Sequence, residues 1–404
     1  MYLASKGICP LLCRDVYQKR LRRKKCCAKE LEVFPMQIAN VTYPLAITMW
    51  DFSWLERRWP GAGYEDWDLI LDELKERGYD AVRIDPYPHL LASDPHREWE
   101  LLPVWNQQVW GSPALNRVSI QPALNQFLQK CRERAIKVAL SSWFRQDRDD
   151  KRLLIKTPQD LGGVWQQTLE NIADAGLLDT ILYVDLCNEF PSHLWAPFFS
   201  PQASDKDRIA RGTPEGKRWM SEAIAVVRAA YPELDYCFSF ISEYEKEQDV
   251  SFLDFLELHI FMTMWSDFDQ QVGYHYEFDD STGYENMVQK AEALYRSRPE
   301  HWKKALSSGI ELAVEWSRYA QKPLITTECW GVINYKDWPL LNWEWVKELC
   351  EYGVRQASAT GRWVAMATSS FCGPQFVGMW RDADWHRRLT DVIHTGPLRA
   401  GAEE

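Results

Sequence analysis

Strand-like and helix-like segments alternate along this chain from Tyr43 onward, and this alternation limits the possible folds more than any other feature. Apolar runs typical of buried strands are predicted at residues 44–50, 79–85, 136–143, 180–190, 234–242, 256–265, 322–328 and 362–370. Segments with apolar residues at helical spacing are predicted at 64–78, 121–135, 157–176, 213–232, 301–320, 342–361 and 382–394, with a short helical stretch just before residue 256. Each predicted strand is thus followed by a predicted helix.

Consecutive strand–helix units of this kind predict one closed barrel of parallel strands. A helix between two strands returns the chain so that the strands run parallel, and eight such units fit a barrel better than a doubly wound sheet. The motif "GAGYED" at Gly61 lacks the third glycine of a dinucleotide-binding loop, and no phosphate-binding lysine loop is found. We therefore expect an α/β fold, a (β/α)8 TIM barrel formed as a single domain by residues 36–404.

The first 35 residues differ in composition from the rest. The segment "RDVYQKRLRRKKCCAK", from Arg14 to Lys29, is strongly basic in a chain whose net charge is -11. It lacks the apolar region and cleavage site of a signal peptide, and Met36 opens a segment that resembles a natural start. Residues 1–35 are interpreted as a basic N-terminal extension: a disordered tail, a targeting arm or a non-native extension of the reading frame.

The composition of the chain argues against nucleic acid and membrane partners. A net charge of -11 does not suit a phosphate backbone, and no apolar run is long enough to span a bilayer. The ten cysteines show neither a zinc-site spacing nor a disulfide framework. Buried free thiols and a reducing, cytoplasmic compartment are therefore expected. No metal or other cofactor is expected, and nothing in the sequence indicates the oligomeric state.

Long loops are predicted where strands end and helices begin. They cover residues 86–120, 190–211 and 266–287, whereas the helix-to-strand joints are short. In a barrel of this kind the strand-to-helix loops form the working face. The chain has 21 tryptophans, and although about half are assigned to the core, indole rings also suit flat apolar ligand faces such as those of sugar rings.

Two carboxylates follow predicted strands that would lie across the barrel mouth from one another. Glu189, preceded by Asn188, lies at the end of the fourth strand, and Glu328 lies at the end of the seventh. Glycoside hydrolysis requires a pair of carboxyl groups that face each other across a cleft. The pair therefore predicts a glycosidase site.

These motifs resemble those of a known group of enzymes. "LCNEFP" and "TTECWG" resemble the strand-4 Asn-Glu and strand-7 Glu of the retaining (β/α)8 glycoside hydrolases of the cellulase family 5-like clan. Arg83 in "AVRID" and His259 in "ELHIF" match that clan's strand-2 arginine and strand-6 histidine, while Phe261 stands where a tyrosine is usual. The run from Met49 to Leu90 is similar to the "cellulase-like" sugar-binding family, and the resemblance extends over about residues 42–395.

The resemblance implies a role for each matching residue. Glu189 would be the general acid/base, with a pKa raised by burial and by Glu328. Glu328 would be the nucleophile, kept ionised by Arg83, and a separation of about 5 Å between the two carboxyl groups would make the enzyme retaining. Asn188 would bind the sugar 2-hydroxyl. His259 would orient Glu328 or a sugar hydroxyl.

Seven further residues are less certain candidates, among them His89 and His193. The other five, two aspartates and three tryptophans, each have an equally plain structural role. Asp51 and Asp85 follow the first two strands and either bind sugar hydroxyls or cap and pair with neighbouring groups. Trp143, Trp330 and Trp380 follow later strands and either stack on a sugar ring or pack into the protein.

Three functions remain open. The first is a retaining β-glycosidase that cuts short oligosaccharides or glycosides from one end, since tryptophan-bearing loops would enclose a pocket. The second is a carbohydrate-binding protein without catalytic activity on the same barrel. The third is a metal-dependent barrel hydrolase, which calls for several histidine and aspartate ligands at strand ends.

Overall fold

The computed structural model of the chain describes residues 35–104, 112, 114–199, 211–241, 244–277, 279–333, 335 and 341–399. The predicted N-terminal extension lies outside these residues, apart from Pro35.

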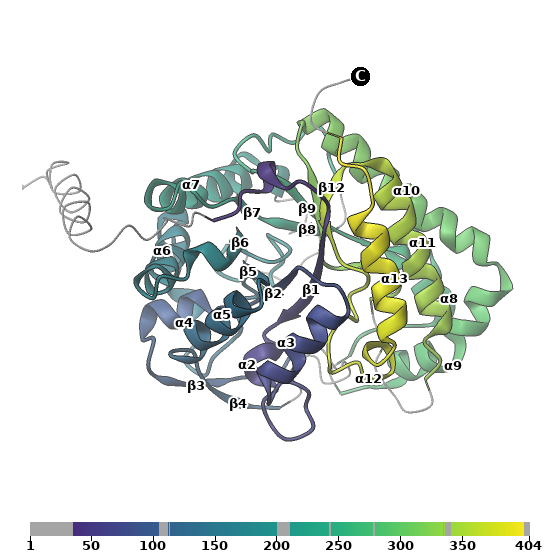
Figure 1. Ribbon diagram of the computed structural model, residues 1–404, viewed down its shortest axis with the longest axis horizontal. Helices are drawn as coiled ribbons and strands as arrows, with labels where there is room; N and C mark the ends of the chain where they lie inside the picture. The colour runs from purple at the N-terminus through teal and green to yellow at the C-terminus, as the bar shows by residue number, and fades with distance from the viewer. Residues whose placement is uncertain are drawn as a thin grey trace, which may run out of the picture. The chain divides into compact units, whose positions relative to one another are not determined.

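The predicted parallel barrel is confirmed (Figure 1). Its strands, in chain order, are β1 (Leu45–Asp51), β2 (Ala81–Ile84), β5 (Lys137–Ser141), β6 (Ile181–Asp185), β7 (Tyr236–Cys237) with β8 (Ser239–Ile241), β9 (Leu256–Phe261), β10 (Leu324–Thr326) and β12 (Trp363–Met366). Each strand pairs in parallel with the next, and β12 pairs with β1. β7 and β8 are two halves of one segment, since β7 pairs with β6 and β8 with β9. A short β11 (Cys329–Trp330) extends the ladder on β9.

Helices surround the barrel. The predicted ones appear as α3 (Trp67–Glu76), α5 (Ala123–Glu133), α6 (Pro158–Asp174), α7 (Pro214–Ala230), α10 (Pro299–Ala320), α11 (Glu344–Thr360) and α13 (Ala383–His394). Shorter elements are α2 (Ser53–Glu56), α4 (Pro88–Ser93), α8 (Phe268–Val272), α12 (Val377–Trp380) and the 3-10 turns at Ile38–Asn40, Lys151–Leu154, Leu178–Thr180 and Met262–Trp265. Thr157 begins α6 with a capping box to Asp160, so the sequence signal for that start is local.

Three features of the fold differ from the sequence prediction. The prediction of a short helix before β9 is wrong, because residues 244–255 form turns. In one of these turns Asp249 Oδ1 accepts a hydrogen bond from the Ser251 amide, a local bond that competes with helix formation. The loop after β2 carries an antiparallel hairpin, β3 (Glu98–Leu101) and β4 (Asn116–Ser119). The loop after β9 ends in a long additional helix, α9 (Thr282–Ser297).

The barrel interior changes from apolar to polar toward the carboxyl ends of the strands. Side chains at alternate strand positions point to the same face. The lower positions form one apolar cluster that includes Ile47, Ala81, Ala139, Tyr183, Cys237, Phe255, Ile325 and Ala365. The next positions along the same strands are polar and fully buried: Arg83, Ser141, Asp185, Ser239, Glu257, His259 and Thr327. Because burying such groups is costly unless they pair, this polar layer marks the functional end of the barrel.

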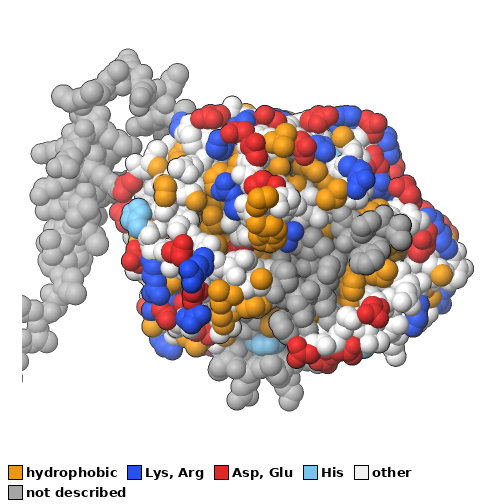
Figure 2. Space-filling model, turned by 90° about the horizontal axis from the view of Figure 1, so that it is seen from below, with side chains coloured by type: hydrophobic (Ala, Val, Ile, Leu, Met, Phe, Trp, Pro, Cys, Tyr) orange, Lys and Arg blue, Asp and Glu red, His pale blue; other side chains and the backbone are white. Residues whose placement is uncertain are grey.

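Charged and hydrophobic side chains share the surface, and the described cysteines are buried as expected. In Figure 2, which views the molecule from below Figure 1, charged side chains of both signs lie along the margin and hydrophobic side chains lie nearer the middle. The six cysteines within the described residues are buried and unpaired. Across that same part of the chain, no helix has both the length and the apolarity that crossing a membrane demands.

Candidate active site

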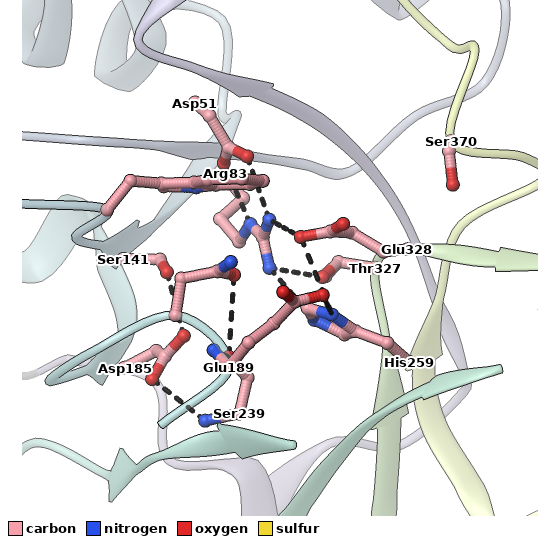
Figure 3. Close-up of polar contacts among 12 residues, drawn as sticks. Asp51, Arg83, Ser141, Asp185, Glu189, Ser239, His259, Thr327, Glu328 and Ser370 are labelled. Carbon is pink, nitrogen blue, oxygen red and sulfur yellow. Dashed lines mark hydrogen bonds and ion pairs between the residues drawn. The ribbon is translucent and has the colours of Figure 1, made fainter. Parts of the chain in front are cut away.

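Glu189 and Glu328 lie close together above the polar layer of the barrel (Figure 3). Glu189 follows β6 with a left-handed backbone (φ 49°), and its amide donates to Ser239 Oγ at 2.9 Å. Glu328 lies between β10 and β11 and is 4% exposed. One carboxylate oxygen of each residue and a ring nitrogen of His259 all lie within 4.8 Å of one another. The two acids follow strands on opposite sides of the barrel mouth, and their side chains thus meet at one point.

His259, on β9, lies between the two acids. Its Nδ1 is 3.0 Å from Glu189 Oε1 and 3.6 Å from Glu328 Oε1. Burial opposes protonation of the ring, but the charges of Glu328 and Glu189 outweigh this and raise the pKa of His259 to about 8. The imidazole is therefore protonated near neutral pH, and its Nδ1 is placed to donate a hydrogen bond to Glu189 Oε1.

Arg83, on β2, is fully buried and holds the polar layer together. Its Nε and Nη2 donate to the two oxygens of Asp51 at 2.9 and 2.8 Å. Nη2 also donates to Glu328 Oε1 at 2.5 Å. On the other side, Nη1 donates to Thr327 Oγ1 at 2.7 Å and to Glu257 Oε1 at 3.2 Å. Asp51 therefore acts as an ion-pair partner, and the bidentate geometry fixes the orientation of the guanidinium.

The surroundings of Glu328 act on its ionisation in opposite directions. Burial raises the pKa of Glu328 to about 7, and the negative charges of Glu189 and Asp51 act in the same direction. The positive charges of His259 and Arg83 oppose this rise but do not cancel it. Near neutral pH, Glu328 and His259 can thus each hold or release a proton at little cost.

Comparison with known proteins identifies the family. A sequence profile described as "Sugar-binding cellulase-like" matches residues 47–394. The chain belongs to the sugar-binding cellulase-like family. A crystal structure from Parabacteroides distasonis, described as a "putative glycoside hydrolase", is 52% identical to this cellulase-like chain, with a TM-score of 0.85. The match covers 88% of this chain and 95% of the Parabacteroides protein.

More distant structures share the fold. The endo-β-1,4-mannanase of Thermotoga petrophila is 13% identical to this cellulase-like chain, with a TM-score of 0.50 over 89% of it and 79% of the mannanase. At this identity the likeness shows a common barrel. Among curated proteins no match to the chain was found.

Asn188 presents an unused donor beside Glu189 in this cellulase-like site. The residue is fully buried, and its backbone amide donates to the Ser142 carbonyl at 2.9 Å. Its side-chain Oδ1 lies 3.5 Å from Ser239 Oγ, whereas Nδ2 has no hydrogen-bond partner among the described residues. A buried amide donor without a partner is costly, so this atom is available to a bound hydroxyl group.

Asp85 and Trp143 organise the wall of the site. The two oxygens of Asp85 accept from the amides of Tyr87 at 2.7 Å and Trp143 at 2.9 Å, and burial raises its pKa to about 7. Of the two roles expected for Asp85, these contacts match that of a residue that caps neighbouring backbone groups.

Trp143 is buried, and its ring lies edge-on to that of Trp195, with 4.7 Å between the ring centroids. Trp195, which the sequence did not single out, donates from Nε1 to Glu189 Oε2 at 3.4 Å.

Trp330 makes the contacts of a packing residue. Its side chain is fully buried, and Nε1 donates to the Ala367 carbonyl at 2.9 Å. The ring lies against α11 where Gly353 has no side chain, and a Cβ there would come within 2.8 Å of it. Trp330 is the last residue of β11 and has a left-handed backbone (φ 82°), and its ring lies in the helix layer against α11.

Trp380 is likewise engaged away from the two acids. Its Nε1 donates to Glu73 Oε2 at 2.6 Å, and the Arg77 guanidinium lies 4.4 Å from the ring centroid. Both partners belong to or follow α3, so these contacts tie α12 to the outer helix layer.

Glu189, His259 and Glu328 also form a group whose atoms could hold a metal ion. The guanidinium of Arg83, however, already lies 2.5 Å from Glu328 Oε1. A divalent cation would have to compete with this fixed positive charge. The arrangement therefore suits proton transfer better than metal binding.

Proposed function

We propose that this protein is a retaining glycoside hydrolase that acts on β-linked short oligosaccharides or glycosides. The observation that carries the proposal is the approach of one carboxylate oxygen of Glu189 and one of Glu328 to within 4.8 Å of each other, which leaves the two carboxyl groups close together. Retaining glycosidases hold their carboxyl groups about 5–5.5 Å apart, whereas inverting enzymes leave about 6.5–9.5 Å for a water molecule. The description of the 52% identical Parabacteroides protein as a "putative glycoside hydrolase" supports the same reaction class.

The first step forms a glycosyl–enzyme ester. The Glu328 carboxylate attacks the anomeric carbon while Glu189 donates its proton to the glycosidic oxygen. The bond between that carbon and oxygen breaks, and the leaving group departs as a neutral alcohol. Glu189 becomes negatively charged, and His259, at 3.0 Å from its Oε1, supplies the compensating positive charge.

The second step releases the sugar. Glu189 removes a proton from water, the water oxygen attacks the anomeric carbon, and the ester bond to Glu328 breaks. Glu328 is regenerated as a carboxylate beside Arg83, and Glu189 is regenerated as an acid. Two inversions leave the product with the configuration of the substrate. Asn188 Nδ2 is the donor that we assign to the sugar 2-hydroxyl, a contact that strengthens in the transition state.

We further propose a small substrate cut from one end, in keeping with the proposed cytoplasmic location. The loop residues expected to enclose a pocket include 105–111 and 200–210, which lie outside the described residues. Efficient internal cleavage of a long polymer would contradict this part of the proposal.

A screen of aryl glycosides that varies sugar and anomer tests the function directly. We expect hydrolysis of one or more β-glycosides, with the β-anomer as the first product detected by proton NMR. First release of the α-anomer would contradict the retaining mechanism. Binding of sugars without hydrolysis throughout the panel would instead support the second function, a non-catalytic carbohydrate-binding protein, which the family description "sugar-binding" keeps open.

The pH dependence of kcat/KM is expected to be a narrow bell. Glu328 must be ionised to attack, so activity falls as the pH drops below its pKa of about 7. His259 must be protonated to stabilise the negative charge that Glu189 acquires in the first step, so activity also falls as the pH rises above about 8, the pKa of His259. The measurement is kcat/KM in buffers from acidic to alkaline, with thermal unfolding followed in the same buffers. A profile that is flat through neutral pH in folded protein contradicts this assignment.

Glu189→Gln is expected to separate the two chemical steps. For an aryl glycoside with an acidic phenol the first step needs little proton donation, so ester formation persists. Hydrolysis of the ester loses its general base and slows by about 10²–10⁴-fold. Stopped-flow measurement should show a burst of phenol followed by slow turnover. Equal losses for acidic and basic leaving groups argue against Glu189 as the acid/base, and Glu300→Gln, at a side chain 83% exposed on α10, is the control.

A further inference from the structure

Glu257 is a third buried carboxylate next to the two acids, and the proposed reaction does not use it. It lies on β9 two residues before His259 and is fully buried. Alternate residues of a strand face the same side, so Glu257 points into the barrel directly below the imidazole. A carboxylate in such a position is expensive unless it has a role in the charge balance of its surroundings.

The contacts of Glu257 link it to both cationic groups of the site. Its Oε1 accepts from Arg83 Nη1 at 3.2 Å and from the Thr327 hydroxyl. The same oxygen lies 4.0 Å from His259 Nε2, on the side of the ring opposite the nitrogen that contacts Glu189. His259 thus lies between one carboxylate below and two above.

The carboxylates around Arg83 outnumber its single positive charge. The single positive charge of Arg83 is shared by three carboxylates, Asp51 at 2.8 Å, Glu328 at 2.5 Å and Glu257 at 3.2 Å. A neutral His259 would leave this buried group with two excess negative charges, and an imidazolium reduces the excess to one. Negative charge held nearby favours the protonated form of every acid in the layer.

We propose that Glu257 is a positioning residue that fixes Arg83 under Glu328 and sustains the protonated states of His259 and Glu328. Its Oε1 anchors Nη1, which leaves Nη2 directed at Glu328. Its charge favours an imidazolium at His259, which in turn faces Glu189. This inference deepens the proposed function and rests on it for its kinetic consequence, although the effect on His259 itself needs no substrate.

Other charged and titratable groups face the same layer from the surrounding strands. They are Asp51 on β1, Arg83 on β2, Tyr183 and Asp185 on β6 with Glu189 after it, Cys237 on β7 and Glu328 after β10. Of these, Arg83 lowers the pKa of His259, and Glu189 and Glu328 raise it. All of them remain in place when Glu257 alone is changed.

Glu257→Gln isolates the charge, because glutamine keeps the shape and can still accept from Arg83 and Thr327. Loss of a negative charge lowers the pKa of the remaining acids, so we expect the pKa of His259 to fall by about one unit. Both limbs of the kcat/KM profile should move toward lower pH. The imidazole titration is followed by NMR on protein with labelled histidine, and His259→Asn identifies the signal.

Cys237→Ala is the matched control. Its Sγ lies 4.0 Å from Glu257 Oε2, so the change alters the packing around Glu257 without altering charge, and it should leave the His259 titration unmoved. An unchanged His259 titration in folded Glu257→Gln overturns the proposal. If the glutamine variant does not fold, the His259 titration is measured in Glu257→Asp instead, because the shorter side chain draws the charge away from Arg83 and His259. A smaller shift in the same direction is then expected, and its absence overturns the proposal. Absence of hydrolysis by the unaltered protein would instead overturn the proposed function.

Discussion

Glu328→Gln is expected to lower kcat/KM for an aryl β-glycoside by at least about 10⁴-fold. The glutamine side chain keeps the shape of the residue but cannot form the glycosyl ester, so neither chemical step can proceed. Binding of the sugar should persist, because Asn188 and the rest of the site are untouched. The measurement is kcat/KM together with the dissociation constant of the released sugar. Glu300→Gln on the exposed face of α10 should retain full activity.

Rescue by azide distinguishes the nucleophile from the acid/base. In Glu328→Ala, azide can enter the space left by the carboxylate and attack the anomeric carbon once, which gives the α-glycosyl azide from a β-glycoside. In Glu189→Ala, the ester to Glu328 still forms and azide replaces water in the second step, which gives the β-glycosyl azide. The opposite pattern of products would exchange the two roles, and no rescue of either variant would count against the double displacement.

Arg83→Met is expected to lower the free energy of unfolding by about 3–5 kcal/mol. Methionine preserves much of the side-chain volume, but Asp51, Glu257 and Glu328 lose the cation that they share within the barrel. Uncompensated buried carboxylates are strongly destabilising unless they take up protons. The measurement is urea unfolding at neutral and at lower pH. The deficit should shrink as the pH falls, because protonation removes the unpaired charges.

Arg355→Met provides the comparison for that result. Arg355 pairs with Glu351 on α11, and the two side chains are 53% and 33% exposed. A solvent-exposed pair of this kind contributes about 0–1 kcal/mol. If Arg83→Met costs no more than Arg355→Met, the polar layer does not depend on the buried guanidinium as described above.

The strands of the barrel could be predicted because their signal is local. A strand buried on both faces is a continuous apolar run, and segments such as 79–85 and 362–370 carry that signal without reference to the rest of the chain. The helix expected before β9 was wrong because a short segment has little helical preference of its own. In this segment the hydrogen bond from the Ser251 amide to Asp249 stabilises a turn in place of the helix.

The two acids of the site could be predicted because strand order places them. The carboxyl ends of barrel strands meet at one face, so Glu189 and Glu328 could be assigned to the mouth from their positions alone. Glu257 carried a weaker signal, a carboxylate two residues before His259 on a buried strand. Trp195 carried none, because its contact with Glu189 depends on how the loop after β6 folds back.

The sequence by itself determined the barrel and the strand ends at which its acids lie, because both follow from hydrophobic periodicity and chain order. The tertiary structure alone decided which charged groups surround those acids. Arg83 meets Asp51, Glu257 and Glu328 from three other strands, and electrostatic energies depend on separations of a few ångströms that no spacing along the chain records. It also decided that Trp330 packs against α11 and Trp380 against α3, because each contact joins segments that are far apart in the chain.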